Sequence, residues 1–455
     1  MDAPAFVPGD ALPGAPDLAG RGPRPVGVTT LPLANPYQID VLGSLAAGEP
    51  VRATRHLSAE VWYPALCDGR ALYTDHLEGP DGERPGSPRT IRFAGRAERD
   101  ADPDRSAGPA PLVVVSHGHL GSPLRHSWLG ENLASKGYAV LALSHTDGTP
   151  EDRGDPLSRL RNRPLDVALA LRVAADLERA HPLLHHVWDA DRVALVGHAM
   201  GGYGVLVALG AGLDVGAFEP LGITDPLRHE LVDDLAAGMP FHEDLVDAVT
   251  SRVRAGVLLA PWGGDAAWSR HALARVSTPL FLAAGSEDDG AAVRTGLAAG
   301  YAGVRTLFEA SVASDRWLLT FDGARHGVGS NPPPEALASA SPDAWWRYAD
   351  PVWDVRRITS VLQHHVTAFL DTHLRGLPRD AYLSGAAAAP RGSDWPGYPP
   401  RSTVGLRMEH RASSPVAEHP GEDVHGVRDL SAAVWAGLSQ AWRAHRSRSS
   451  RPTGV

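Results

Sequence analysis

The stretch DRVALVGHAMGGYGVLVAL, residues 191–209, decides the fold of this 455-residue chain. The apolar residues Val193–Val196 predict a buried strand, and the small and apolar residues that follow the glycines predict a helix. Between them, Gly197-His198-Ala199-Met200-Gly201 has the glycine spacing of a nucleophile elbow, the sharp strand-to-helix turn of G-x-S-x-G motifs. The glycines allow close backbone approach in such a turn. Its middle residue is Ala199 where the motif has serine, so the turn lacks its nucleophile.

The regions around the elbow predict an α/β fold with a mostly parallel central sheet and helices on both faces. Apolar runs and amphipathic segments alternate at βαβ spacing, which places ligands at the carboxyl ends of the strands. Alternating residues between 26 and 64 predict antiparallel strands at the sheet edge. The other strands are expected at residues 90–93, 111–117, 139–145, 256–261, 279–285 and 316–323, and the helices at 126–138, 164–181, 291–300 and 355–374.

The domain organisation follows from changes in composition along the chain. Residues 1–24 are rich in Pro, Gly and Ala without periodicity, and we expect a mobile leader. Residues 25–377 form the α/β domain, and the mixed helical segment 214–254 interrupts the sheet pattern where a cap over the site is expected. Residues 378–455 are expected to be a partly disordered extension that ends in a solvated basic tail.

Composition limits the partners of this chain. Hydrophobic residues make up 43% and charged residues 21% of the chain, which suits a large globular core. A net charge of −10 argues against nucleic acid as the main partner. No stretch has the length and apolarity of a membrane span, and the first residues lack the pattern of a signal peptide, so we expect a cytoplasmic location. The single Cys67 excludes an internal disulfide scaffold, and the sequence leaves the oligomeric state open.

An acid and a histidine follow later strands in the order that a catalytic triad on this fold requires. Asp288 follows the predicted strand at 279–285 and is the first choice for the acid, because a carboxylate there can orient a histidine ring. Glu287, Asp289 and Asp265 remain alternatives. His326 lies in a glycine-flanked loop after the next predicted strand and is the expected general base.

Other residues complete the expected site. The oxyanion hole needs two backbone N–H groups, which we assign to Met200, directly after the nucleophile position, and to His119 in the loop Ser116-His117-Gly118-His119. Trp262 and Trp268 suit a hydrophobic substrate group, although core packing explains them equally well. No histidine pattern has metal-ligand spacing, so neither a metal nor another cofactor is expected.

Four motifs carry a resemblance to a known superfamily. VVVSHGHLGSPLRHSWLGENLASKGYAVLALSH (113–145), VGHAMGG (196–202), GSEDD (285–289) and ARHG (324–327) together resemble bacterial α/β-hydrolases of the dienelactone-hydrolase-like group. They also resemble platelet-activating-factor acetylhydrolases, whose WYPA motif is echoed at residues 62–65. The resemblance extends over about residues 26–375. It implies the α/β-hydrolase fold and a carboxylic ester hydrolase that acts on an ester or lactone through an acyl-enzyme. In acetylhydrolase-like members the acid follows the preceding strand, which would select Asp265.

Two explanations of Ala199 remain open. In the first, which we favour, the chain is an inactivated form of a serine hydrolase, because the elbow glycines, acid, base and oxyanion loop are all present. In the second, the alanine is natural, and the chain is a pseudo-hydrolase that binds a hydrophobic ligand or catalyses a lyase or cyclisation step with His326 as base.

Overall fold

The computed structural model describes residues 7–68, 71–77, 89–147, 155–214, 223–232, 251–263, 268–289, 300–333, 345, 348–384 and 395–415. The helix predicted at 291–300, all but its last residue, lies outside these ranges. So do Asp265 and most of the 214–254 insert, in which residues 214, 223–232 and 251–254 are described, including the short helix α5 (Pro226–Glu230).

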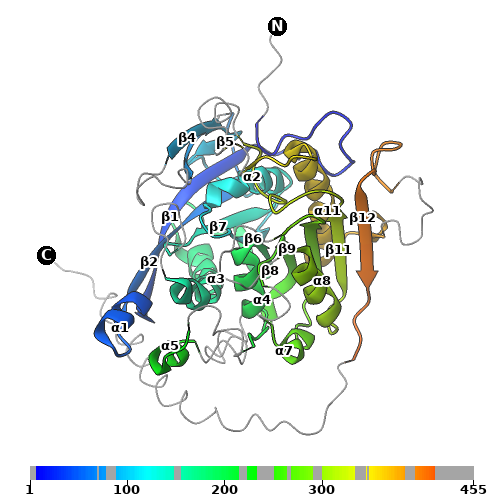
Figure 1. The fold of residues 1–455 in the computed structure, drawn as a ribbon. Coiled ribbons are helices and arrows are strands. Elements are labelled where there is room, and N and C mark those ends of the chain that lie inside the picture. The colour runs from blue at the N-terminus through cyan, green and yellow to red at the C-terminus, as the bar shows by residue number, and fades with distance from the viewer. Residues whose placement is uncertain are drawn as a thin grey trace, which may run out of the picture.

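A ten-stranded sheet forms the centre of the molecule, and helices cover both faces, as predicted (Figure 1). Its six middle strands run parallel in the order β11-β10-β9-β8-β6-β7. They are β6 (Ala110–Ser116), β7 (Ala139–Ser144), β8 (Trp188–His198), β9 (Val253–Leu259), β10 (Leu280–Gly285) and β11 (Arg316–Phe321). Because helices cover both faces, these strands are almost entirely buried, which explains their continuous apolar runs.

Alternate residues of each parallel strand enter two separate cores. In β6, Leu112 and Val114 pack on one face of the sheet, and Val113 and Val115 pack on the other. The first face is covered by α3 (Pro156–Ala180), α4 (Met200–Ala208), α7 (Arg270–Ala274) and α8 (Tyr301–Ala310). The second face is covered by α2 (Ser127–Ser135) and α11 (Val355–Arg375).

Antiparallel strands extend both sides of the sheet. β1 (Val26–Ile39), α1 (Val41–Ala47) and β2 (Arg52–Pro64) form a long hairpin that joins β7 through β2, as the alternating pattern predicts. The short β5 (Ala97–Arg99) is an exception, because it pairs in parallel with β1. β3 (Leu72–Leu77) and β4 (Arg89–Ala94) form a separate two-stranded sheet, and β4 contains the strand predicted at residues 90–93.

The expectation of a mobile leader at residues 1–24 is corrected for residues 7–24, which pack against α2 and α11. The Asn132 amide donates to the carbonyl of Ala19 at 2.9 Å, and the Gln363 amide donates to the carbonyl of Gly9 at 3.0 Å. The Leu18 N–H donates to Nδ1 of His364 at 3.1 Å. Composition alone could not reveal these long-range partners, which replace the hydrogen bonds of a regular element.

The expected boundary at residue 377 is also corrected. β12 (Leu406–Arg411) pairs antiparallel with β11, from Leu406 opposite Phe321 to Arg411 opposite Arg316, and closes the outer edge of the sheet. The short helix η4 (Asp380–Leu383) buries Leu383 in the core on the α11 side. The domain therefore continues through Arg411.

The helix predicted from Pro164 begins earlier, because α3 starts at Pro156 and contains Pro164 in its interior. Asp155 caps the helix by accepting from the N–H of Leu157 at 2.8 Å, and Pro156 occupies the first turn, where its missing N–H does no harm. Among the described residues, no helix combines the length and the apolar character needed to cross a bilayer.

Candidate active site

The turn between β8 and α4 has the geometry of a nucleophile elbow. β8 ends at His198 and α4 begins at Met200, so Ala199 alone makes the turn. Its backbone has φ 48° and ψ −116°, a combination that residues with a Cβ rarely adopt. The N–H of Ala199 donates to the Leu259 carbonyl at 2.9 Å, and its own carbonyl accepts from Trp262 N–H at 2.9 Å. These bonds tie the strained residue to β9 and to the segment that follows it.

The elbow glycines are required by close backbone contacts. A Cβ on Gly201 would overlap the carbonyl oxygen of Ser116, and one on Gly197 would overlap the carbonyl of Gly201. A Cβ on Gly202 would lie 2.8 Å from Cβ of Pro261. The roles inferred for these glycines from the sequence therefore match the space around them.

His326 and Asp288 meet at the carboxyl ends of two neighbouring strands. Asp288 follows β10, His326 follows β11, and Nδ1 of His326 lies 2.9 Å from Oδ2 of Asp288. The Asp288 side chain is 1% exposed and that of His326 is 26% exposed. With the Nδ1 proton donated to the carboxylate, Nε2 remains as the basic nitrogen of the ring. The buried Asp288 carboxylate is thus hydrogen-bonded to the His326 ring, in the position that the predicted acid requires.

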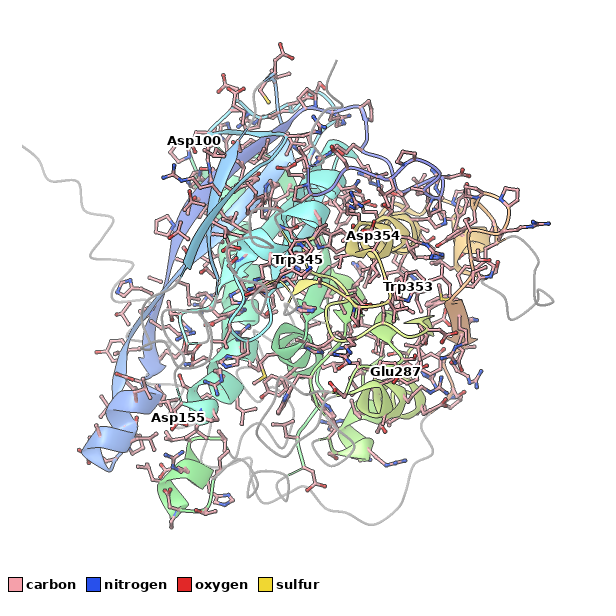
Figure 2. All side chains as sticks on the ribbon, turned by 45° about the horizontal axis from the view of Figure 1, so that its top comes forward. Asp100, Asp155, Glu287, Trp345, Trp353 and Asp354 are labelled. Atoms are coloured by element: carbon pink, nitrogen blue, oxygen red, sulfur yellow. The ribbon has the colours of Figure 1, made fainter. Side chains whose placement is uncertain are left out.

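The alternative acids differ from Asp288 in position. Glu287 and Asp289 are exposed, and Figure 2 shows Glu287 close to α8. Asp265 lies outside the described residues. Among the carboxylates that the structure describes, Asp288 is the one that is hydrogen-bonded to the His326 ring.

Two histidine rings, those of His126 and His326, lie next to the ring of His198 at the end of β8, and the three differ in pKa. The rings of His198 and His326 have centroids 5.7 Å apart, and those of His198 and His126 are 5.4 Å apart. Burial lowers the pKa of His198 far below its usual value, with further lowering by His126 and His326. Burial also lowers the pKa of His126, to about 4. For His326, burial acts in the same direction, but the hydrogen bond and charge of Asp288 outweigh it and raise its pKa. Of the three, His326 is the ring whose pKa is raised, so it binds a proton most readily.

The His326 loop is fastened to the start of α2. The carbonyl of Gly329 lies 3.0 Å from Nδ1 of His126 and accepts from the Trp128 indole at 2.9 Å. The Asn331 amide donates to the Leu124 carbonyl at 2.8 Å, and its oxygen accepts from the Trp128 N–H at 3.1 Å. Sequence reasoning missed both His126 and Asn331. The only local signal is the polar Ser330-Asn331 pair after the glycines of the loop.

The two expected oxyanion donors lie on either side of the elbow. Met200 is the first residue of α4, where an N–H has no acceptor within the helix. Gly118, which precedes His119, lies directly against the elbow, because a Cβ added to it would be 3.2 Å from Cβ of Ala199. The loop and the elbow are therefore close enough to line one small space, while the His119 side chain itself is exposed.

Trp262 and Trp268 pack around Tyr203 of α4. Their rings lie 5.5 Å and 5.7 Å from the Tyr203 ring, centroid to centroid, and the two residues are only 4% and 3% exposed. This arrangement supports the packing role for both side chains. A substrate contact through their remaining exposed edges stays a prediction.

Other parts of the described chain do not form a metal site. No group of three or more His, Cys, Asp or Glu side chains in those ranges has the arrangement of a metal centre.

Trp353 and Asp354, which Figure 2 labels in front of α11, have structural contacts. The Trp353 indole donates to the Asp322 carbonyl at 2.8 Å, and Asp354 caps α11.

Comparison with known proteins places similarity around the elbow. A family model described as PET hydrolase-like matches residues 101–222, which contain the expected oxyanion loop and the elbow but end before Asp288. The cutinase est2 of Thermobifida alba is 34% identical over 109 residues, and a platelet-activating factor acetylhydrolase of Canis lupus familiaris is 28% identical. Each match covers 24% of this chain and 33% of the relative. The chain thus spans about one third of the length of these curated relatives.

Similarity of the fold extends much further. A ferulic acid esterase from Streptomyces cinnamoneus superposes with a TM-score of 0.50 over 84% of this chain and 96% of that structure, at 20% sequence identity. At this identity the likeness concerns the fold alone. The expected resemblance to platelet-activating-factor acetylhydrolases is confirmed, and the cutinases extend it.

Proposed function

We propose that this α/β-hydrolase has the site of a carboxylic ester hydrolase that uses an acyl-enzyme, and that Ala199 leaves the present chain without its nucleophile. The observation that carries the proposal is the elbow itself. A residue with a Cβ is held at φ 48° and ψ −116° between β8 and α4, beside a histidine that is hydrogen-bonded to a buried carboxylate. That strained turn serves to present a side chain above the sheet edge, which alanine cannot use for chemistry.

The relatives support ester chemistry as the class of reaction. The cutinase, the acetylhydrolase and the ferulic acid esterase are named for the cleavage of esters, and the PET hydrolase-like match includes the elbow. We infer a small-molecule ester or lactone with a hydrophobic part as the substrate of this chain. Trp262 and Trp268 are candidates for contact with that part.

With serine restored, each group has a defined task. The hydroxyl at position 199 would attack the ester carbonyl while Nε2 of His326 accepts its proton. Asp288 would hold the ring and stabilise the charged imidazolium. The N–H groups of Met200 and His119 would donate to the oxyanion of the tetrahedral intermediate.

The test compares this chain with Ala199→Ser on short and medium p-nitrophenyl esters. Loss of a triad nucleophile costs on the order of a million-fold in turnover in other triad enzymes, so serine should raise kcat by at least about 1000-fold. Adding His326→Ala to the serine variant should abolish the gain, because the hydroxyl would lose its general base.

The alternative is a natural pseudo-hydrolase, and Ala199 is the observation that favours it. In that case the pocket binds a hydrophobic ligand, or His326 acts as base in a lyase or cyclisation step. If a folded Ala199→Ser variant gains no esterase activity, the hydrolase proposal is wrong and this alternative takes its place.

A further inference from the structure

The carbonyl of Gly118, in the expected oxyanion loop, is held by three donors. It lies 2.7 Å from Nδ1 of His117, 3.3 Å from NH2 of Arg163 and 3.2 Å from the N–H of Gly121. In a trans peptide the C=O and the N–H point in opposite directions. The three donors therefore also set the direction of the next N–H, that of His119, which points to the side opposite Arg163.

The proton of the His117 ring is fixed by a second contact. The backbone N–H of His145 donates to Nε2 of His117 at 3.1 Å, so Nε2 carries no proton. Burial, together with the charges of Arg163 and His145, holds the pKa of His117 well below its usual value, and the ring is neutral. Its one proton must lie on Nδ1 and be donated to the Gly118 carbonyl.

His145 is itself held in a second Ser–His–Asp hydrogen-bond network, whose serine is Ser116 rather than the residue at the elbow turn. Its Nε2 lies 2.8 Å from Ser116 Oγ, and its Nδ1 lies 2.8 Å from Oδ2 of Asp166. Arg55 completes the network with two 2.8 Å hydrogen bonds to the Asp166 carboxylate. This is the bonding order of a catalytic triad.

Burial excludes the Ser116–His145–Asp166 network as a second catalytic centre. Ser116, His145 and Asp166 are each 0% exposed, and Ser116 is the last residue of β6 rather than part of a strained turn. A substrate carbonyl cannot reach the hydroxyl. The Ser116–His145–Asp166 network instead fixes the backbone at His145, directly after β7, and the N–H of His145 contacts the His117 ring.

Arg163 is the charged member of this cluster. It is 0% exposed, and it donates to the carbonyls of His117 and Gly118. Within the described ranges no carboxylate lies in ion-pair distance of it. Burial lowers the pKa of Arg163 to about 10, against the opposing charges of Asp147 and Asp166, so it stays charged at neutral pH. Burial of an unpaired charge is costly, so these carbonyl contacts are the main compensation for it.

The elbow helix makes room for Arg163. A Cβ added to Gly204 of α4 would lie 3.1 Å from Cβ of Arg163 and 3.3 Å from its carbonyl carbon. The close approach of α3 and α4 at this point places the guanidinium behind the oxyanion loop. A donor with positive charge on a peptide carbonyl also polarises that peptide and strengthens its N–H as a donor.

We propose that Arg163 is a positioning residue of the oxyanion hole, which with His117 orients the Gly118–His119 peptide so that the His119 N–H faces the reacting carbonyl. The inference rests on the proposed esterase function for its kinetic consequence. The orientation of the loop is a separate property of the chain as it stands.

The kinetic test uses Arg163→Met in the Ala199→Ser background. Methionine keeps most of the buried volume and removes both donors. We expect kcat to fall by about 10- to 100-fold with little change in KM, because an oxyanion donor acts in the transition state. Arg163→Lys should recover part of the loss. His117→Phe removes the Nδ1 donor to the Gly118 carbonyl together with the Nε2 acceptor of the His145 N–H. It should give a loss of the same kind and replaces Arg163→Met if that variant does not fold.

Arg161→Met is the matched control. Arg161 is also buried on α3, but it donates to the carbonyl of Leu231, away from the oxyanion loop. Arg161→Met in the Ala199→Ser background should therefore keep kcat within about threefold of the kcat of Ala199→Ser, since no catalytic donor is disturbed. Equal losses of kcat in Arg161→Met and Arg163→Met would assign Arg163 a general structural role and overturn the proposal.

A second readout does not depend on activity. Amide hydrogen exchange is measured by mass spectrometry on the Ala199 chain, with and without Arg163→Met. Exchange across residues 117–121 should become faster in Arg163→Met and stay unchanged in Arg161→Met. Unchanged exchange in both would overturn the proposal. If Ala199→Ser is inactive, the esterase proposal fails, and the exchange experiment alone decides the role of Arg163.

Discussion

At Ala199 the backbone holds a conformation that costs on the order of 1–3 kcal/mol for a residue with a Cβ. The surrounding structure maintains it through the hydrogen bonds to Leu259 and Trp262 and through the glycines that let β8, α4 and β6 meet. Such strain is common where a side chain must be presented to a substrate. Position 199 therefore combines the strongest functional signal of this chain, its strained backbone, with the absence of the one atom that the chemistry would need, the serine Oγ.

The pH dependence of the restored enzyme is set by His326 and Asp288. Asp288 raises the pKa of His326 in spite of burial, so the neutral base is lost as pH falls through a value above the ordinary 6.5 or so. We expect kcat/KM of Ala199→Ser to rise with pH through a midpoint above about 6.5. Asp288→Asn in that background should lower the midpoint and reduce kcat by about 10⁴-fold, as measured in pH–rate profiles.

Glu287→Gln serves as the control for this profile, because Glu287 is exposed and the His326 ring has Asp288 as its partner. It should leave the midpoint unchanged. A midpoint that moves with Glu287→Gln and not with Asp288→Asn would show that the acid has been assigned incorrectly.

Among the helices, α4 supplies a hydrogen-bond donor that α3 lacks because of Pro164. Pro164 has no N–H, so the carbonyl of Leu160, four residues earlier, lacks its helical donor. The hydroxyl of Tyr203 in α4 donates to that carbonyl at 2.8 Å. A proline in α3 and a tyrosine in the elbow helix thus form one long-range contact. It fixes the position of α4 against α3, the same helix that carries Arg163.

We expect Tyr203→Phe to lower the free energy of unfolding by about 1–3 kcal/mol, because it leaves a buried carbonyl without a donor. In a Pro164→Ala background the same change should be less costly, since the alanine supplies the helical N–H that proline lacks. Urea unfolding of the four chains measures this coupling. Equal losses in both backgrounds would show that the hydroxyl does not compensate for the proline.

In the molecule as a whole, the two ends of the described chain cover parts of the domain that lie outside the parallel strands. Residues 7–24 lie over α2 and α11, and β12 covers the open edge of β11. Composition predicted a leader and an extension, since both segments are rich in Pro, Gly and Ala. Such segments gain stability from long-range hydrogen bonds, which a local pattern does not show.

A chain that starts at Pro25 should therefore be less stable than the full chain. Removal of residues 1–24 takes away both acceptors of the Asn132 amide, the carbonyls of Gly9 and Ala19, at a cost of about 1–3 kcal/mol. The Gln363 amide loses the Gly9 carbonyl and keeps only the longer hydrogen bond to the Trp128 carbonyl. We expect the midpoint of thermal unfolding to fall by about 5 °C, as measured by calorimetry. Asn132→Ala should lower the midpoint in the full chain and have less effect in the shortened one. Equal midpoints of the full and shortened chains would restore the view of a mobile leader.

Local sequence patterns were enough to predict the features that depend on neighbouring residues. Continuous apolar runs predicted the parallel strands, glycine spacing predicted the elbow at Ala199, and the chain order of strand ends selected Asp288 and His326. The strands lie where these patterns place them, and Asp288 and His326 lie within hydrogen-bond distance, because each signal spans a few residues and parallel strands align their carboxyl ends at one edge. The catalytic roles of the two side chains stay predictions. The predicted start of α3 at Pro164 was wrong, although Asp155 and the proline after it form a local signal for the true start at Pro156.

The contacts between side chains far apart in the sequence depend on how the chain folds. The pairing of Tyr203 with Leu160, the fastening of the His326 loop by Asn331, and the cluster of Ser116, His145 and Arg163 all join segments that are tens of residues or more apart. Such partners depend on strand register and on how helices cross the sheet, quantities that no local pattern encodes. For that reason the elbow could be predicted from its sequence motif, whereas the groups that orient the neighbouring oxyanion loop could not.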